Sequence, residues 1–332
     1  MSQADAPVAV EVMRGGMVES GHRVRAAVVD DHDRLLAWAG DVEGAVYPRS
    51  AIKMFQAIPL VETGAADAFG VTNEELALAC ASHGGEPMHV DRVTAWLARL
   101  GLAPCDLGCG AHAPSHGPTA REMLRHGFEP NRAHNNCSGK HTGMLTAATH
   151  KGEPVASYLD LDHPVQQRVL DVVRRYTGDA VSRAPGVDGC GVPTWAIPLR
   201  AVALAAARFG ASGDRAPMAL RRAMGGHPEL VAGTGRCCTA VMRTAPHVVV
   251  KTGAEGVFLA AIPDLRLGIA LKVEDGARRA SEVALIDILR QLDILDEAAI
   301  NILGETARPV LRNFTGREVG SIRAAGHWLE RA

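Results

Sequence analysis

The order of the periodic segments limits the fold of this chain more than any other feature. Between Val8 and Gly40, three strand-like runs are separated by the turn signals GG and DHD. Connections this short join antiparallel strands. A strand pattern returns only near the end, in HVVVKTGAEGVFLAAIP and LRLGIALKV. The sequence therefore predicts an α/β fold of the α+β kind, in which both termini form one antiparallel sheet, flanked by helices, with an inserted helical region.

The middle of the chain has the periodicity of helices separated by loops rich in Gly and Pro. Helical patterns cover residues 73–100 in two pieces, 119–127, 142–150, 165–176, 194–209 and 217–224. One more helical pattern, GARRASEVALIDILRQL, follows the last strands. We expect a single catalytic unit over residues 1–332, with a sheet-containing α/β part at 1–65 and 240–332 and a mainly helical part at 66–239.

Composition argues against several classes of function. The 35 Lys and Arg balance 37 Asp and Glu, so no charge excess directs the chain to nucleic acid or to a membrane surface. Aromatic residues make up 4%, too few for platforms that stack bases or sugars, and a small polar substrate fits better. No signal-peptide pattern and no membrane-length apolar run is visible, which predicts a cytoplasmic protein. Its seven cysteines are then expected to be thiols or metal ligands, not disulfides.

The first chemical motif lies in the stretch YPRSAIKMFQ. Pro48 is not tolerated inside a helix, so a helix is predicted to begin just after it, with Arg49 or Ser50 near the N-cap. Helical spacing then places Ser50 and Lys53 on one face, one turn apart. Burial of that helix favours the neutral form of the lysine, which can accept the proton of a serine hydroxyl. Alone, S-x-x-K also describes an N-cap serine followed by a solvated lysine.

Two further short motifs follow in chain order, Ser82-His83-Gly84 and Lys251-Thr252-Gly253. The ordered set resembles the motifs of serine β-lactamases, penicillin-binding proteins and glutaminases, whose architecture matches the predicted layout. The implied chemistry is acyl transfer: Ser50 attacks a carbonyl, Lys53 receives its proton, Ser82 relays a proton to the leaving nitrogen and Lys251 adds positive charge. The alternative is that Ser82 caps a turn and Lys251 ends a strand in solvent.

Five longer stretches extend this likeness over nearly the whole chain. They are YPRSAIK from Tyr47, ASHGGE from Ala81, NNCSGKH from Asn135, DGCGVP from Asp188 and KTGAEG from Lys251. Together they resemble the L-asparaginases of the Rhizobium etli type, also called class 3 or thermolabile asparaginases. The resemblance implies hydrolysis of L-asparagine, Ser50 as nucleophile with Lys53, a second Ser-Lys pair of Ser82 and Lys251, and a homodimer.

The resemblance also implies a zinc ion held by Cys137, Lys140 and Cys190. Spacing alone favours Cys137, Cys190 and His141, because zinc sites normally draw on Cys and His. A lysine ligand must be a neutral amine, which requires the metal to displace its proton. Because Ser50 already supplies a nucleophile, such an ion is expected to organise the loops and not to activate water. The alternative is a pair of reduced cysteines in packed loops.

An amino-acid substrate needs a cation for its α-carboxylate and an anion for its α-ammonium group. Arg49 fits the first role, and Asp188 the second, with Glu255 as an alternative. His83 is either a site residue or a satisfied turn histidine. The adjacent pair Cys237-Cys238 is left without an assigned role.

Two other functions compete with the asparaginase hypothesis. One is a glutaminase or a hydrolase of another small amide, which differs by as little as one methylene in the substrate. The other is a penicillin-recognising binding or sensor module, against which the missing export signal counts.

Overall fold

The structure is a computed structural model that describes residues 5–332. Tertiary contacts divide the chain into two units. Unit 1 consists of the chain up to Ala51, Ala196–Ala211 and Ala240–Ala332, and unit 2 of Ile52–Trp195 and Ser212–Thr239. These bounds differ from the expected parts in two places, since residues 52–65 belong with the helices and residues 196–211 with the sheet.

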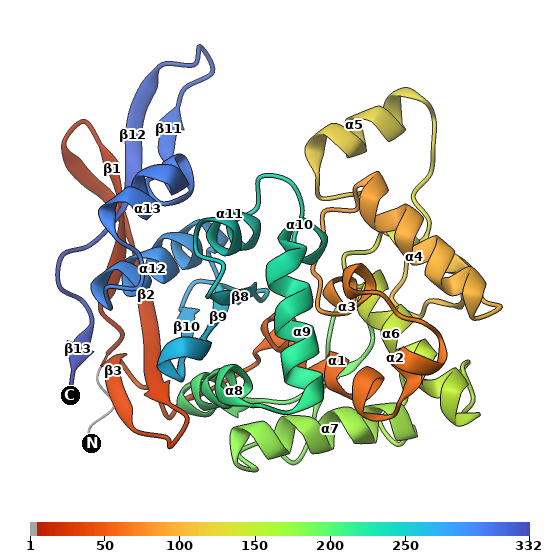
Figure 1. Ribbon diagram of the computed structural model, residues 1–332. Helices are drawn as coiled ribbons and strands as arrows, with labels where there is room; N and C mark the ends of the chain where they lie inside the picture. The colour runs from red at the N-terminus through yellow and green to blue at the C-terminus, as the bar shows by residue number, and fades with distance from the viewer. Residues whose placement is uncertain (1–4) are drawn as a thin grey trace. The chain divides into compact units, whose positions relative to one another are not determined.

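The sheet of unit 1 is antiparallel at every pairing and contains strands from both ends of the chain, as the sequence predicts. Its main order is β11-β12-β1-β2-β10-β9-β8, with β3 beside β2 and β13 beside β3. Figure 1 shows the N-terminal strand β1 (red) next to β12 (dark blue). The strands are β1 (Val8–Arg14), β2 (Met17–Asp30), β3 (Leu35–Ala39), β8 (Val249–Thr252), β9 (Val257–Ile262), β10 (Leu267–Val273), β11 (Val310–Arg312), β12 (Glu318–Ala324) and β13 (Glu330–Arg331).

The long strand β2 organises this sheet. Its first half is mostly exposed and pairs with β1, whereas Val24–Asp30 is mostly buried and lies between β10 and β3. Helices α8 (Leu199–Ala211) and α12 (Arg278–Gln291) pack against the sheet. The smaller elements are β4 (Ala45–Val46), β7 (Ile197–Pro198), α13 (Glu297–Leu303), and the short 3-10 helices Arg49–Ile52, Pro263–Leu265 and Gly304–Thr306.

Unit 2 is built around α1 (Lys53–Glu62), whose residues from Lys53 to Val61 are all buried. It packs against α6 (Ser138–Lys151), α7 (Pro164–Thr177) and α9 (Arg215–Gly226). The other elements are α2 (Ala65–Ala68), α3 (Asn73–Ala79), α4 (Pro87–Arg99), α5 (Gly117–Arg125), α10 (Pro228–Val231), β5 (Gly186–Val187) and β6 (Pro193–Thr194). Helix α11 (Cys237–Thr244) carries the chain from unit 2 into unit 1.

Two helix starts illustrate where local signals succeed and where pairing overrides them. Thr72 caps α3, and it forms a capping box with Glu75. The helix expected from residue 194 begins instead at Leu199, because Thr194 pairs with Gly186 and Ile197 with Val46 in short strands. Pro198 then lies immediately before the helix, where its missing N–H costs nothing.

Candidate active site

The amine of Lys53 lies at the centre of a buried polar cluster in unit 2. Its Nζ is 3.0 Å from Ser82 Oγ and 3.1 Å from Cys137 Sγ. It also donates to the backbone carbonyls of Ala81, at 2.5 Å, and Asn136, at 3.3 Å. The side chain of Lys53 is fully buried, as the sequence predicts for this helix. The cluster thus joins three loops or helix starts that are far apart in the sequence.

Ser50 lies in unit 1, on the 3-10 turn Arg49–Ile52 that runs directly into α1. The prediction of an N-cap at Arg49 or Ser50 is wrong, because Arg49 has φ of +52° and the α-helix starts only at Lys53. A non-glycine residue in this left-handed region stores backbone strain, which is common at functional turns. Ser50 is half-buried.

The K-T-G motif ends strand β8 and meets the Ser50 turn within unit 1. A Cβ atom on Gly253 would lie 2.6 Å from Pro48 O and 3.3 Å from Ala51 Cβ, so only glycine permits this approach. Lys251 is buried, and its Nζ donates to the carbonyl of Thr252 at 2.8 Å. The structure therefore places two of the predicted motifs side by side in unit 1. Ser82, the predicted partner of Lys251, belongs to unit 2.

Cys137, Lys140 and Cys190 form a second part of the buried cluster. Lys140 Nζ is 2.9 Å from Cys190 Sγ, and the two cysteine sulfurs hydrogen-bond to each other. All three side chains are at most 5% exposed. Cys137 starts α6, while Cys190 lies in the turn between β5 and β6. These are the three residues that the family resemblance implies for zinc.

The charges of this cluster favour one thiolate between two amines. The hydrogen bond from Cys190, the nearby amine of Lys53 and that of Lys140 outweigh burial and hold the pKa of Cys137 well below its usual value. The same hydrogen bond and burial raise the pKa of Cys190. Burial acts to lower the pKa of Lys140, but the sulfurs of Cys190 and Cys137 and the Asp188 carboxylate raise it overall, to about 12.

His141, the competing third ligand, does not complete a metal cluster with the cysteines. Within residues 5–332, no three His, Cys, Asp or Glu side chains are grouped so that they could hold a metal ion. His141 Nδ1 hydrogen-bonds to Tyr158 OH at 2.6 Å, and its buried Nε2 has no hydrogen-bond partner among these residues. Lys140, the other alternative, has its amine 2.9 Å from the Cys190 sulfur.

His83 has both ring nitrogens engaged inside unit 2. Its Nδ1 accepts from the N–H of Gly85 at 3.1 Å, and its Nε2 is 2.9 Å from Ser138 Oγ. The ring stacks on His89 with centroids 4.6 Å apart, and burial together with the nearby charge of His89 holds its pKa well below the usual value. This arrangement favours the alternative of a satisfied turn histidine that supports Ser82.

The remaining predicted substrate ligands lie on turns. Arg49 and Asp188 are half-buried, and the Asp188 carboxylate accepts from the N–H of Gly189 at 2.7 Å. Asp188 also belongs to the charge environment of Lys140. Glu255 is exposed on the turn between β8 and β9, with its carboxylate directed at Gly276. Asp188 therefore lies with the thiol cluster of unit 2, and Glu255 does not.

Sequence reasoning missed the residues that fix this cluster. Asn135 accepts from the N–H of Cys137 at 2.8 Å and donates to the carbonyls of Cys109 and Gly110. The signal in the sequence is its place in NNCSGKH, two residues before Cys137. The contact between Lys53 and Cys137 had no signal, because 84 residues separate the two in the chain.

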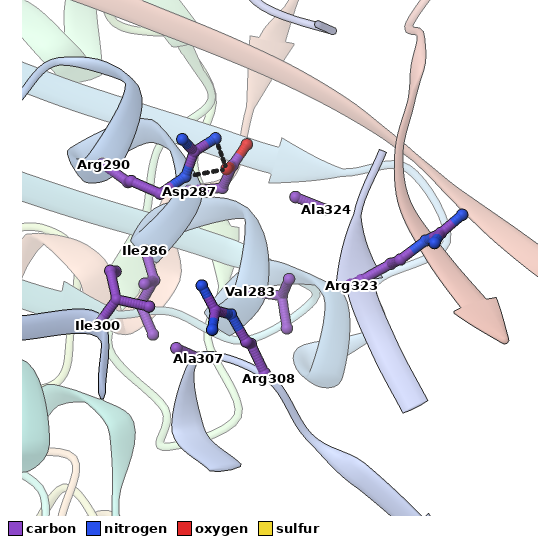
Figure 2. Close-up of a pocket in the computed structure, with 9 residues that line it drawn as sticks. All are labelled: Val283, Ile286, Asp287, Arg290, Ile300, Ala307, Arg308, Arg323 and Ala324. Carbon is purple, nitrogen blue, oxygen red and sulfur yellow. Dashed lines mark hydrogen bonds and ion pairs between the residues drawn. The ribbon is translucent and has the colours of Figure 1, made fainter. Parts of the chain in front are cut away.

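A cavity of about 360 Å³ in unit 1 contains none of the predicted site residues. It is lined by Val283, Ile286, Asp287, Arg290, Ile300, Ala307, Arg308, Arg323 and Ala324. Figure 2 shows Arg290 bonded to Asp287 and Arg323 pointing away from the other side chains. Arg290 is paired with Asp287, Arg308 with Glu297 and Arg323 with Glu11. The cavity therefore has no excess of positive charge that would attract an anion.

Comparisons with known proteins bear on this geometry. No curated protein matches the chain. Among solved structures, Mglu in its native form is 13% identical and aligns over 93% of this chain and 73% of its own, with a TM-score of 0.47. D-alanine carboxypeptidase AmpC from Burkholderia cenocepacia is 14% identical over 81% of this chain and 93% of its own, with a TM-score of 0.39. The family model for L-asparaginase II matches residues 10–324, nearly the whole chain, and the protein therefore belongs to the L-asparaginase II family.

Proposed function

We propose that this protein hydrolyses L-asparagine to L-aspartate and ammonia through an acyl-enzyme on Ser50. The family makes the chain an amidohydrolase, and the proposal adds the substrate and the Ser-Lys mechanism. The observation that carries it is the environment of Lys53. A buried amine that begins α1, three residues after Ser50, and touches Ser82 Oγ at 3.0 Å has the placement of a general base.

The reaction divides into two steps. Ser50 Oγ forms a bond to the side-chain carbonyl carbon of the substrate, and its proton passes to the neutral amine of Lys53. The C–N bond then breaks, and the nitrogen leaves as ammonia after it receives a proton through Ser82 and Lys53. Water repeats the sequence against the ester on Ser50, releasing aspartate and restoring the serine. No redox step is involved, so the atoms balance as amide plus water giving acid plus ammonia.

Substrate orientation is assigned to the charged turn residues. We assign the α-carboxylate to Arg49, which is adjacent to the nucleophile, and the α-ammonium group to Asp188. We assign to Lys251 a positive charge near the Ser50 turn, because Gly253, two residues further along, closely approaches Pro48. Glu255 and His83 are the weaker candidates, because the carboxylate of the first is directed at Gly276 and the ring of the second is fully engaged.

We further propose that Cys137, Lys140 and Cys190 hold a zinc ion. The donor set fits, since two sulfurs and an amine converge in a buried cluster, and zinc binds thiolates readily. When bound, the ion supplies a fixed positive charge that ties the start of α6 to the turn between β5 and β6. Binding must displace protons from the amine and at least one thiol, so zinc affinity is expected to fall as the pH is lowered from 8 to 6.5. Competition with a chromophoric chelator measures this, and a pH-independent affinity contradicts the lysine ligand.

The primary test is ammonia release from L-asparagine by purified protein. We expect activity in the wild type, and a loss of at least about 1,000-fold in Ser50→Ala and Lys53→Met. Ser321→Ala, a half-buried serine of unit 1 on strand β12, is the matched control and should remain active. Mass spectrometry of quenched reactions should detect an aspartyl group on the peptide that contains Ser50. A fully active Ser50→Ala variant would disprove the mechanism.

Rates on L-glutamine decide between the two amide substrates. One additional methylene changes discrimination by about 1–3 kcal/mol in an apolar pocket. We expect kcat/KM for asparagine to exceed that for glutamine by at least about tenfold. The opposite order would identify a glutaminase while leaving the Ser-Lys mechanism intact.

A homodimer is also proposed, on the family resemblance, and light scattering of the purified protein tests it.

Among the helices of residues 5–332, none has the length and apolar character needed to cross a membrane.

A further inference from the structure

We propose that Cys137 has a second role, separate from metal binding: its sulfur positions the amine of Lys53. The inference rests on the proposed function, in which Lys53 is the general base. It concerns a contact between two side chains of the chain itself, so it can be tested without metal.

The geometry around Nζ makes Cys137 and Ser82 competitors for the same amine. Four polar atoms surround Nζ, whereas the neutral amine of the proposed mechanism has only two N–H groups and one lone pair. The carbonyls of Ala81 and Asn136 belong to the backbone and can only accept, so they take the two N–H groups. Ser82 Oγ and Cys137 Sγ, at 3.0 and 3.1 Å, share the remaining side, where the lone pair that receives the serine proton lies. The sulfur therefore sets how far the amine leans towards Ser82.

The sulfur is itself held firmly, which a positioning group requires. The N–H of Cys137 donates to Asn135 Oδ1, and the amide of Asn135 is anchored by the carbonyls of Cys109 and Gly110. On its other side the sulfur hydrogen-bonds to Cys190. Helix α6 is fixed against α3, because Gly139 approaches the carbonyl of Leu78 so closely that a Cβ would lie 2.3 Å from the oxygen. The Cys137 sulfur is thus a rigid neighbour for the Lys53 amine.

A purely metal-binding role predicts something different. If the sulfur served the metal alone, removing the metal would make the wild type and a Cys137 variant equivalent. If it also positions Lys53, a difference must persist in the metal-free proteins.

The experiment compares metal-free wild type, Cys137→Ala and Cys137→Ser after treatment with a chelator, with kcat and KM for L-asparagine measured from ammonia release. We expect Cys137→Ala to lower kcat by about 10- to 100-fold with KM changed less than about threefold, because misplacement of a reacting group acts on the chemical step. Cys137→Ser should recover part of this loss, since its hydroxyl can still form a hydrogen bond with the amine. Cys105→Ala removes a thiol of unit 2 that takes no part in this network and should retain kcat.

Equal kcat values for metal-free wild type and Cys137→Ala would overturn the inference. A second readout is independent of activity: the unfolding midpoints of Cys137→Ala, Lys53→Met and the double variant. We expect the two shifts to be non-additive because the side chains touch, and additive shifts would count against the contact. If the wild type releases no ammonia, the proposed function fails, and this stability cycle still decides whether the contact exists.

Discussion

Gly253→Ala tests whether the K-T-G strand end fixes the turn that carries Ser50. The new Cβ would lie 2.6 Å from Pro48 O and 3.1 Å from Val257 Cβ. The distance from the new Cβ to Pro48 O must grow by about 0.4 Å to reach 3.0 Å, the lower limit for real Cβ contacts. Neither neighbour is the end of a flexible side chain, because Pro48 O belongs to the backbone and Val257 lies in the buried strand β9. The turn residue Pro48 lies two positions before Ser50, so this displacement is transmitted to the nucleophile.

The expected effect follows from that displacement. A misplacement of 1 Å can cost about 100-fold in rate, so a shift of roughly half that size should lower kcat by about tenfold. The strain should also reduce the free energy of unfolding by about 1–3 kcal/mol, as other overpacked sites do. Ammonia release and urea unfolding measure the two quantities.

Gly326→Ala is the matched control for this variant. Gly326 is also in unit 1, and a Cβ there meets nothing within 4 Å, so neither quantity should change. If Gly253→Ala keeps its kcat within twofold of the wild type, the strand end does not fix the Ser50 turn and the reasoning is refuted.

Three further predictions concern unit 2. Gly139→Ala should destabilise the protein by about 1–3 kcal/mol in urea unfolding, because its Cβ would lie 2.3 Å from Leu78 O; an unchanged midpoint contradicts the close packing of α6 on α3. Burial lowers the pKa of His89 from 6.5 to about 4, so the unfolded chain takes up a proton below pH 6.5 that the folded chain refuses. Stability should therefore fall by up to about 3 kcal/mol as the pH drops from 6.5 to 4, and His89→Asn should flatten this dependence in urea titrations at several pH values. The two carboxylate oxygens of Glu86 accept from the N–H and the hydroxyl of Thr234, at 2.9 and 2.6 Å. Glu86→Gln replaces one of these acceptors and should lower the free energy of unfolding by about 1–3 kcal/mol, measured by thermal unfolding. Equal stability would show that the amide satisfies both donors.

The terminal sheet was predictable because its signals are local. Alternating strands between short turns identify β1 to β3, and the burial of Val24–Asp30 follows from its apolar run. The capping box at Thr72 is equally local, since its two partners lie three residues apart. The N-cap near Ser50 was misjudged because Arg49 adopts a left-handed conformation, which local propensity disfavours and which the surrounding structure must impose.

The candidate site likewise combines residues that the sequence identifies with contacts that it does not. The motifs supplied the residues Ser50, Lys53 and Ser82, because their chemistry is written in short spacings. The sequence could not indicate that Lys53 contacts Cys137. Spacing alone favoured His141 beside the cysteines, whereas the amine of Lys140, which the family resemblance implies, lies against Cys190. Those contacts join segments 50 to 84 residues apart, and their distances depend on how α1, α6 and the turn between β5 and β6 pack. Composition and periodicity determined which chemical groups are present and on which elements they lie. Only tertiary packing decided which amine contacts which sulfur, because contacts between distant segments depend on the whole core and not on neighbours in the chain.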